Sequence, residues 1–192
     1  HRLAWASETL EKDLEEKKLI LPRKSALELQ KLLNLYPGEV NLSFSSNQIL
    51  ISSDEFRFVS NLIEGNYPDY QKVFPSGEEQ TLKVEKSLIQ TALNRASVLS
   101  NEKYRGVKFI LSKDNLKICV NNPSKESAEE EISVDFSGED LDICFNISYI
   151  QESLSVIHNA EVDFVFYGPE NSCIIKNNKN DNLVHVIMPM RL

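Results

Sequence analysis

The stretch "TLKVEKSLIQTALNRASVLS", residues 81–100, decides the fold of this chain. Residues 81–85 alternate apolar and polar side chains, which predicts a strand. The stretch 86–100 has apolar side chains at positions 88, 89, 92, 93, 96 and 99, the spacing of one helix face. Three alternating stretches follow, at 106–112, 115–121 and 130–137, and each predicts a further strand. Strand, helix and three strands make one βαβββ unit.

The same order of elements occurs twice more along the chain. Downstream, a strand at 141–146 and a helix at 148–159 precede strands at 161–167, 172–177 and 183–189. Upstream, a strand at 18–22 and a helix at 23–36 precede strands at 39–45, 47–53 and 55–63. Residue identity between the units is low, so the shared order is the evidence for a repeat.

A single βαβββ unit cannot bury the apolar faces of both its helix and its sheet. Two units together can, with two helices side by side backed by two antiparallel sheets, and the fold class is therefore α+β. We expect residues 71–192 to form a complete domain and residues 1–70 to be the C-terminal half of another. The stretch "HRLAWA" at 1–6 would be the last strand of a missing half, and 64–80 reads as a linker.

The overall charge argues against a broad basic surface for nucleic acid. The 192 residues are 41% hydrophobic and carry a net charge of −8. Basic residues gather on the predicted helices, as Arg23, Lys24 and Lys31 on the first and Lys86 and Arg95 on the second. The acidic run between residues 125 and 142 is either a solvated edge or a docking face for a basic partner.

The sequence contains no recognisable catalytic, metal or cofactor motif. The three histidines, His1, His158 and His185, are far apart, and the hydrolase, metalloprotease and nucleotide-binding signatures are absent. Three cysteines without a C-x-x-C spacing favour reduced thiols over a disulfide framework or a zinc site. No apolar stretch is long enough to predict a membrane span or a signal peptide. We expect a protein that is not an enzyme by itself; one alternative is a small hydrolase using Cys119 or Cys144.

The stretch "VHVIMPMRL", residues 184–192, has two interpretations. An alternating strand runs into Met-Pro-Met-Arg-Leu, and these methionines could simply close a sheet as core residues. Alternatively they could line a surface that serves many partners, because a thioether side chain repacks at low cost. The residues alone leave both interpretations open.

Seven motifs, in order along the whole chain, resemble the bacterial sliding-clamp family. They are "HRLA", "PRK", "NYPDY" followed by "VFP", "LSNEKYRGVKF", "FNISY" and the terminal "VIMPMRL". The resemblance implies a DNA-clamp fold with helices on the DNA side and sheets outside, and a chain that lacks the first domain and half of the second. In the family, three domains per subunit pair head to tail with a second subunit in a ring around duplex DNA. It implies a cytoplasmic, non-catalytic processivity factor that tethers polymerases, the clamp loader and repair proteins.

The resemblance also implies specific sites. A groove between the second and third domains would bind short linear peptides, and a scaffold with this groove but no role on DNA is the alternative function. Its lining would be His1, Arg2, Leu3, Pro68, Lys72, Val73, Tyr104, Asn146, Tyr149, Ser172, Val186, Met188, Pro189, Met190, Arg191 and Leu192. Lys72 stands where many relatives have Arg, which would weaken planar contacts there.

Two further sets of residues are predicted to meet macromolecular partners. The resemblance assigns DNA contact to Arg23 and Lys24, and the helix-face pattern extends it to Lys86 and Arg95. The family's interface between subunits maps onto Val98, Leu99, Glu126, Glu129 and Glu130. The apolar pair would supply burial, and the acids would steer a basic partner surface.

Overall fold

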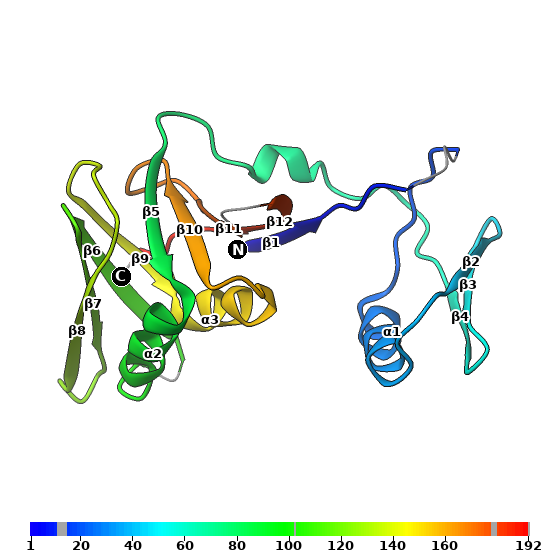
Figure 1. The fold of residues 1–192 in the computed structure, drawn as a ribbon, viewed down its shortest axis with the longest axis horizontal. Coiled ribbons are helices and arrows are strands. Elements are labelled where there is room, and N and C mark those ends of the chain that lie inside the picture. Colours follow the sequence, from blue (N-terminus) through cyan, green and yellow to red (C-terminus); the bar gives the residue numbers. More distant parts are fainter. Residues whose placement is uncertain (11–14, 102, 178–179, 192) are drawn as a thin grey trace. The chain divides into compact units, whose positions relative to one another are not determined.

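The computed structural model describes residues 1–10, 15–101, 103–177 and 180–191, with the side chains of 180 and 181 left out. The chain divides into two compact units (Figure 1). The large unit comprises residues 1–9 and 69–192, and the small unit comprises residues 10–68. No helix in the described part of the chain is long and apolar enough to cross a bilayer.

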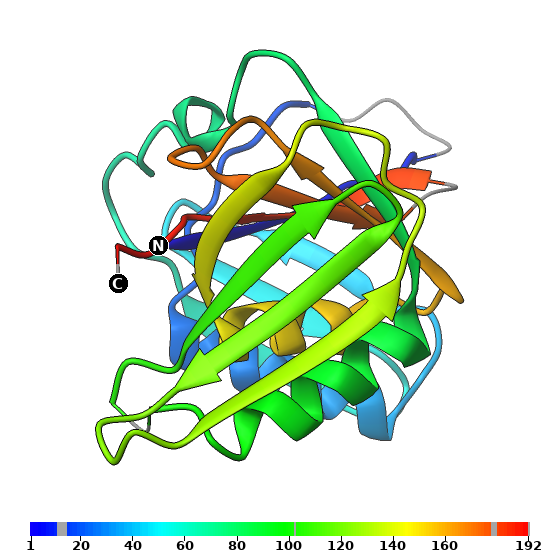
Figure 2. The ribbon, with the colours of Figure 1, turned by 90° about the vertical axis from the view of Figure 1, so that its left-hand side faces the viewer.

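The large unit contains two antiparallel sheets and two helices, which confirms the predicted α+β fold (Figures 1 and 2). One sheet has the order β1 (Arg2–Ala6), β12 (Asn180–Ile187), β11 (Cys173–Asn177), β10 (Glu161–Phe166) and β5 (Gln80–Glu85). The other has the order β8 (Ser127–Ser133), β7 (Asn115–Asn121), β6 (Gly106–Ser112) and β9 (Leu141–Asn146). The helices α2 (Lys86–Ser97) and α3 (Ile147–Val156) contact each other, and a 3₁₀ helix spans Tyr70–Val73.

The two repeats of the large unit exchange their first strands. Strand β5 leads into α2 but pairs with β10 of the other repeat, with Leu82 opposite Phe164. Strand β9 leads into α3 but pairs with β6, with Ile143 opposite Phe109. Each sheet therefore contains strands of both repeats, so neither repeat completes its sheet alone.

One continuous core fills the space between the sheets and the helices. Phe109 packs edge to face on Phe145, with ring centroids 5.7 Å apart, and Phe164 stacks on Phe166 at 6.4 Å. Helix α2 buries Ile89, Ala92, Leu93 and Ala96, all of which belong to the stripe predicted from the sequence. Burying each large apolar side chain contributes roughly 1.5–3 kcal/mol.

The small unit holds one helix, α1 (Arg23–Leu35), and one sheet with the order β2 (Asn41–Phe44), β3 (Gln48–Ser52) and β4 (Arg57–Asn61). Its buried apolar side chains are few, with Ile49 and Ile51 on β3, and α1 buries none of its residues. The prediction of a strand at 18–22 is wrong, because the structure assigns none there. The first strands of the other repeats form by pairing with a second repeat, and the small unit contains only one.

A recurring hydrogen bond confirms the threefold repeat. In each repeat, the carbonyl two residues before the helix N-cap accepts from an amide that follows the last strand of the same repeat. The three bonds run from Ile63 N to Ile20 O at 2.9 Å, from Asp135 N to Lys83 O at 3.0 Å, and from Met190 N to Cys144 O at 2.7 Å. Their shared polarity and position show that one local architecture is used three times.

The structure shifts most of the predicted boundaries by a few residues. Strand β8 ends at Ser133, four residues before the predicted end at 137, because the chain turns there so that Asp135 can bridge to Lys83. Strand β1 pairs with β12 along its whole length, from Arg2 opposite Ile187 to Ala6 opposite Leu183. Residues 1–9 therefore belong to the large unit.

Candidate functional site

A hollow of about 620 Å³ opens on the large unit where three segments meet. The segments are the end of the 3₁₀ helix with the chain that follows it, the loop between β10 and β11, and the tail that follows β12. The lining residues are Lys72, Val73, Phe74, Pro75, Ser76, Pro169, Glu170, Asn171, Ser172, Met188, Pro189, Met190 and Arg191. Seven of the residues predicted from the resemblance are among them: Lys72, Val73, Ser172 and Met188 to Arg191.

An apolar cluster on one face of the five-stranded sheet supports this hollow. Its buried members are Val165, Ile174, Val184 and Val186. Leu3, Trp5, Val73, Phe74 and Tyr167 pack against them. Val186 and Leu3, which face each other across β12 and β1, therefore lie beneath the apolar wall of the hollow and do not line it. Val73 and Phe74, which line the hollow, pack against this cluster.

The tail is fixed by its backbone and leaves side chains free. The amide of Met188 donates to the carbonyl of His1 at 3.0 Å, which extends the pairing of β1 and β12. The amide of Met190 donates to the carbonyl of Cys144 on β9 at 2.7 Å, so the tail links the two sheets. The side chain of Met188 remains 37% exposed. Two anchored amides with accessible apolar side chains make this a preformed surface.

The polar rim of the hollow is held by local contacts. Tyr167 Oη donates to Glu79 at 2.9 Å, and burial together with this bond raises the pKa of Tyr167 to about 12. The carbonyl of Tyr167 accepts from Asn171 Nδ2 at 2.5 Å. These bonds join the β10–β11 loop to the segment before β5. The rim cations Lys72 and Arg191 form exposed pairs, with Asp69 at 3.4 Å and Glu170 at 3.6 Å, and remain accessible to a ligand.

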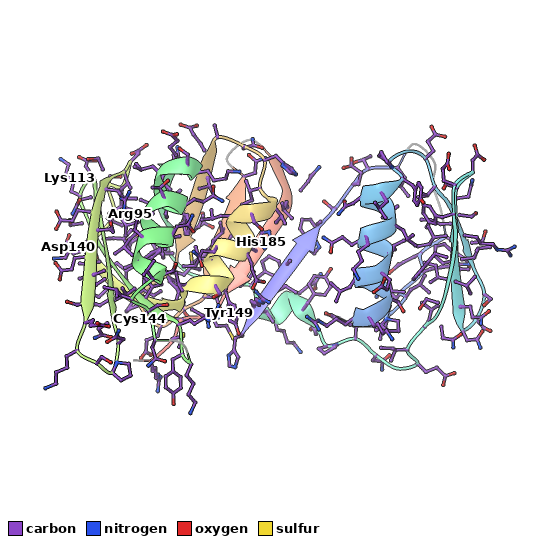
Figure 3. The ribbon with its side chains drawn as sticks, turned by 90° about the horizontal axis from the view of Figure 1, so that it is seen from below. Arg95, Lys113, Asp140, Cys144, Tyr149 and His185 are labelled. Atoms are coloured by element: carbon purple, nitrogen blue, oxygen red, sulfur yellow. The ribbon has the colours of Figure 1, made fainter. Side chains whose placement is uncertain are left out.

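Several predicted groove residues lie elsewhere. Arg2 lies on the opposite face of the sheet, where its guanidinium pairs with Glu152 at 2.5 Å and stacks at 4.4 Å on the ring of Tyr149, labelled in Figure 3. Asn146 caps α3 by accepting from the amide of Ser148, and its Nδ2 donates to the carbonyl of Tyr104 at 3.4 Å.

The remaining predicted groove residues take other positions. Tyr104 lines a separate hollow of about 280 Å³. His1 contributes its carbonyl to the tail, as described above. Pro68 belongs to the small unit, and Leu192 lies outside the described residues.

Six lining residues were not predicted from the sequence. They are Phe74, Pro75, Ser76, Pro169, Glu170 and Asn171. The available signal was the pair of proline turns, "VFPSG" and "YGPEN", each beside a strand. Proline turns of this kind mark loops, but the sequence does not show which two loops meet across a sheet.

The predicted DNA-contacting residues differ in whether their side chains bond to other residues of the chain. Arg23 and Lys24 are exposed at the start of α1. Lys86 instead donates to the carbonyl of Ile157 at 2.6 Å. Arg95, labelled on α2 in Figure 3, makes two hydrogen bonds to Glu130, at 2.7 Å and 2.6 Å. These bonds lower the pKa of the Glu130 carboxyl.

The residues predicted to meet a second subunit lie near the end of α2, and just before and within β8, an edge strand. Val98 is 79% exposed, whereas Leu99 packs against the main core. The three acids have partners within the chain: Glu126 with Asn122, Glu129 with Lys117 at 2.6 Å, and Glu130 with Arg95. The exposed apolar surface at this place is therefore contributed by Val98 and not by Leu99.

The described residues contain no group of His, Cys, Asp or Glu side chains that could hold a metal ion. Cys119 and Cys144 are half-buried, and desolvation by burial raises the pKa of both thiols. A raised pKa keeps a thiol protonated near neutral pH, which argues against either cysteine as a nucleophile.

Comparison with known proteins places these features in a family. The C-terminal domain of the DNA polymerase III beta subunit matches residues 71–191, and the central domain of the same protein matches residues 1–69. A curated relative from Pseudomonas aeruginosa, named beta sliding clamp, is 39% identical over the whole chain, and one from Escherichia coli is 35% identical. The chain covers 53% and 52% of these relatives, so it spans about half their length.

Solved structures agree with this assignment. The crystal structure of the Pseudomonas aeruginosa DNA polymerase III subunit beta has a TM-score of 0.95 at 38% identity, and the match covers all of this chain and 53% of that one. A sliding clamp from Bartonella birtlesii has a TM-score of 0.93 at 34% identity, with coverages of 100% and 56%. From its sequence, its repeated architecture and these matches, the chain belongs to the DNA polymerase III beta subunit family.

Proposed function

We propose that this protein acts as a sliding clamp, a non-catalytic processivity factor that encircles duplex DNA and tethers replication and repair proteins. In this proposal, residues 71–192 are the complete third domain and residues 1–70 the C-terminal half of the second, in line with the two family matches. The protein would act in the bacterial cytoplasm and would need no cofactor.

The hollow beside the tail carries the proposal. It joins apolar walls from Val73, Phe74 and Met188 to a rim of exposed polar and charged groups. A short peptide with one or two large apolar side chains fits this chemistry. Each buried side chain contributes roughly 1.5–3 kcal/mol. After the cost of ordering the peptide, the dissociation constant would be on the order of micromolar.

Relatives support a ligand site in this fold. Clamps from Pseudomonas aeruginosa and Bartonella birtlesii have both been solved bound to griselimycin. We infer that the hollow of this chain binds linear motifs from polymerases, the clamp loader and repair proteins. Leu3, Val186 and the carbonyl of His1 would support the site from beneath, as the contacts described above allow.

Contact with DNA would be through phosphates and independent of sequence. Arg23 and Lys24 on α1 are exposed and suit that role. The ring would hold DNA topologically, which makes a net charge of −8 compatible with the function. A second copy of the full-length protein would close the ring at Val98 and the edge strand β8, with the acids of that strand facing a basic surface.

The second candidate is a peptide-binding scaffold without a role on DNA. The engagement of Lys86 and Arg95 in internal hydrogen bonds favours it, because both cations of α2 are already used. The two candidates differ in one measurement, made on a protein of the relatives' full length. A clamp loaded onto DNA stays on a closed circle and slides off after linearisation, whereas a scaffold is retained on neither.

A further inference from the structure

The open face of the four-stranded sheet carries a lysine between two cysteines. Burial alternates along β6, β7 and β9, so one face of this sheet packs into the core and the other is partly open. On the open face, Lys108 of β6 lies directly opposite Cys119 of β7 and Cys144 of β9, the latter labelled in Figure 3. Directly opposite side chains have Cβ atoms about 4.5–5.5 Å apart, so the two thiols flank the lysine stem.

A hollow of about 500 Å³ opens over these three side chains. Its lining includes Gly106 and Ala128, whose small size leaves room above the sheet. Cys119 and Cys144 are half-buried, and the side chain of Lys108 is 40% exposed. A small reagent can therefore reach both thiols and the amine from the same space.

The two cysteines are too far apart to join each other. They lie on either side of β6, two strand spacings or roughly 9–10 Å apart, whereas a disulfide needs Cα atoms within about 7 Å. The side chains that the structure describes also form no group suited to a metal ion. The chemistry left to this place is that of a thiol beside an amine.

We propose that Lys108 is an acylation site for small acyl thioesters and that the flanking thiols relay the acyl group to it. In the first step, the sulfur of a cysteine attacks the acyl carbon. A new C–S bond forms, the bond to the leaving thiol breaks, and the proton of the cysteine passes to that thiol. In the second step, the neutral amine of Lys108 attacks the same carbon. A C–N bond forms, the C–S bond breaks, and a proton of the amine returns to the cysteine. The sum is a thioester and an amine giving an amide and a thiol, with the cysteine regenerated.

The second step is favoured because donor and acceptor share one scaffold. A thiol and an amine on neighbouring strands react as one molecule, which replaces a slow encounter between the amine and a reagent in solution. Nζ of Lys108 lies 2.6 Å from Oδ2 of Asp142, which precedes Cys144 by two residues on β9. The amine therefore leans toward the strand of Cys144, so we expect Cys144 to be the main relay and Cys119 the lesser one.

The charges at this place set the pH dependence of the transfer. Burial raises the pKa of both thiols, although the Lys108 ammonium acts in the opposite direction on each. The hydrogen bond to Asp142 raises the pKa of Lys108. Each step needs a deprotonated group, so the transfer is slow near neutral pH and becomes faster as the pH rises. A single modification event tolerates this slowness, whereas turnover by an enzyme does not. This inference does not depend on the proposed function.

The test is acetylation of the whole chain by an uncharged thioester, S-acetyl-N-acetylcysteamine, followed by peptide mass spectrometry. Lys108 should be acetylated at least about tenfold faster than Lys113, which lies in the β6–β7 turn with no cysteine opposite it. Cys144→Ser should remove most of this advantage, and Cys144→Ser combined with Cys119→Ser should remove all of it. The control is an acetyl N-hydroxysuccinimide ester, which acylates amines directly. Both variants should leave its reaction with Lys108 unchanged.

A further variant reveals the acylated thiol itself. Lys108→Arg keeps the positive charge but removes the acceptor amine, so a hydroxylamine-sensitive acetyl group should accumulate on Cys144. In the wild type this group should be scarcer, because it passes on to Lys108. Two results would overturn the proposal. One is equal thioester-dependent acetylation of Lys108 in the wild type and the double serine variant. The other is the absence of a hydroxylamine-sensitive acetyl group from both cysteines of Lys108→Arg.

Discussion

Arg95 shows how a single internal pair can limit what a surface offers. Its guanidinium is held by both oxygens of Glu130, in the bidentate geometry that it would otherwise offer to a phosphate. Both side chains are partly or largely exposed, so the pair itself adds little to the free energy of folding. Its main effect is to neutralise a positive charge that α2 would otherwise present to a ligand.

We therefore predict that Glu130→Gln strengthens weak binding of duplex DNA. One freed guanidinium should add about one phosphate contact, which steepens the dependence of log K on log salt by roughly 0.9. Glu129→Gln is the control. It removes the same charge from the same strand, but Glu129 pairs with Lys117 and not with Arg95. The measurement is fluorescence anisotropy of a labelled duplex across a salt series. Equal slopes for both variants would show that Arg95 does not meet DNA.

His185 gives a prediction for pH. Its Nε2 is buried without a hydrogen-bond partner, and burial lowers the pKa of this imidazole. As the pH falls, the unfolded chain therefore takes up a proton on His185 near the ordinary histidine pKa, whereas the folded chain takes up that proton only at a lower pH. Stability is full above the unfolded pKa and falls as pH drops through it toward the folded pKa.

Thermal melts between about pH 7.5 and pH 5 measure this effect, since this range spans the ordinary histidine pKa. The melting temperature of the wild type should fall over this range, and that of His185→Gln should fall less. The other titrating groups are the same in both proteins, so the difference between the two pH dependences reports His185 alone. A variant with the same pH dependence as the wild type would exclude His185 as its source.

At the scale of elements, the local pattern of apolar residues predicted most helices and strands. The remaining features depend on how strands from different repeats pair. The helices and strands of the large unit follow directly from apolar periodicity, because each buries one face against a shared core. The strand expected at 18–22 does not form. Its ladder partner would come from another repeat, which a local pattern cannot report. The exchange of β5 and β9 between repeats escaped prediction for the same reason.

The tail illustrates the same limit within the site. Its sequence indicated an apolar surface after β12, and the structure adds an anchor, the bond from Met190 N to the carbonyl of Cys144. That bond is made by the backbone, so no side-chain pattern reveals it. The partners of the tail across the hollow, Phe74 and Pro169, lie on loops whose meeting depends on the whole sheet.

We predict that removing residues 190–192 lowers stability as well as peptide affinity. Losing the Met190–Cys144 bond should cost about 1 kcal/mol. Met190→Ala keeps the amide and should melt close to the wild type, so the comparison separates the backbone bond from the side chain. Thermal or denaturant unfolding measures the difference. Deletion without any loss of stability would show that the anchor contributes nothing.

At the scale of the whole molecule, the two units differ in how much they bury. The main core of the large unit includes five phenylalanines among its fully buried side chains, whereas Ile49 and Ile51 are the buried apolar side chains among the described residues of the small unit. Unequal burial predicts unequal local stability. A single cooperative transition is therefore not expected.

Hydrogen exchange at low protein concentration tests this expectation. Amides of α1 and β2–β4 should lose protection at a lower denaturant concentration than those of α2, β6 and β10. Simultaneous loss of protection in both units would contradict the division.

The most direct test of the central claim is binding of a peptide to the hollow beside the tail. A labelled peptide of the Gln-Leu-x-Leu-Phe type should bind the wild-type chain with a dissociation constant on the order of micromolar. Met188→Glu should weaken this binding by at least about tenfold, or roughly 1.4 kcal/mol. Val156→Glu on α3 is the control, since Val156 is 44% exposed and does not line the hollow. Fluorescence anisotropy with both variants gives the answer: selective loss in Met188→Glu is the predicted result, and unchanged affinity in that variant would contradict the site.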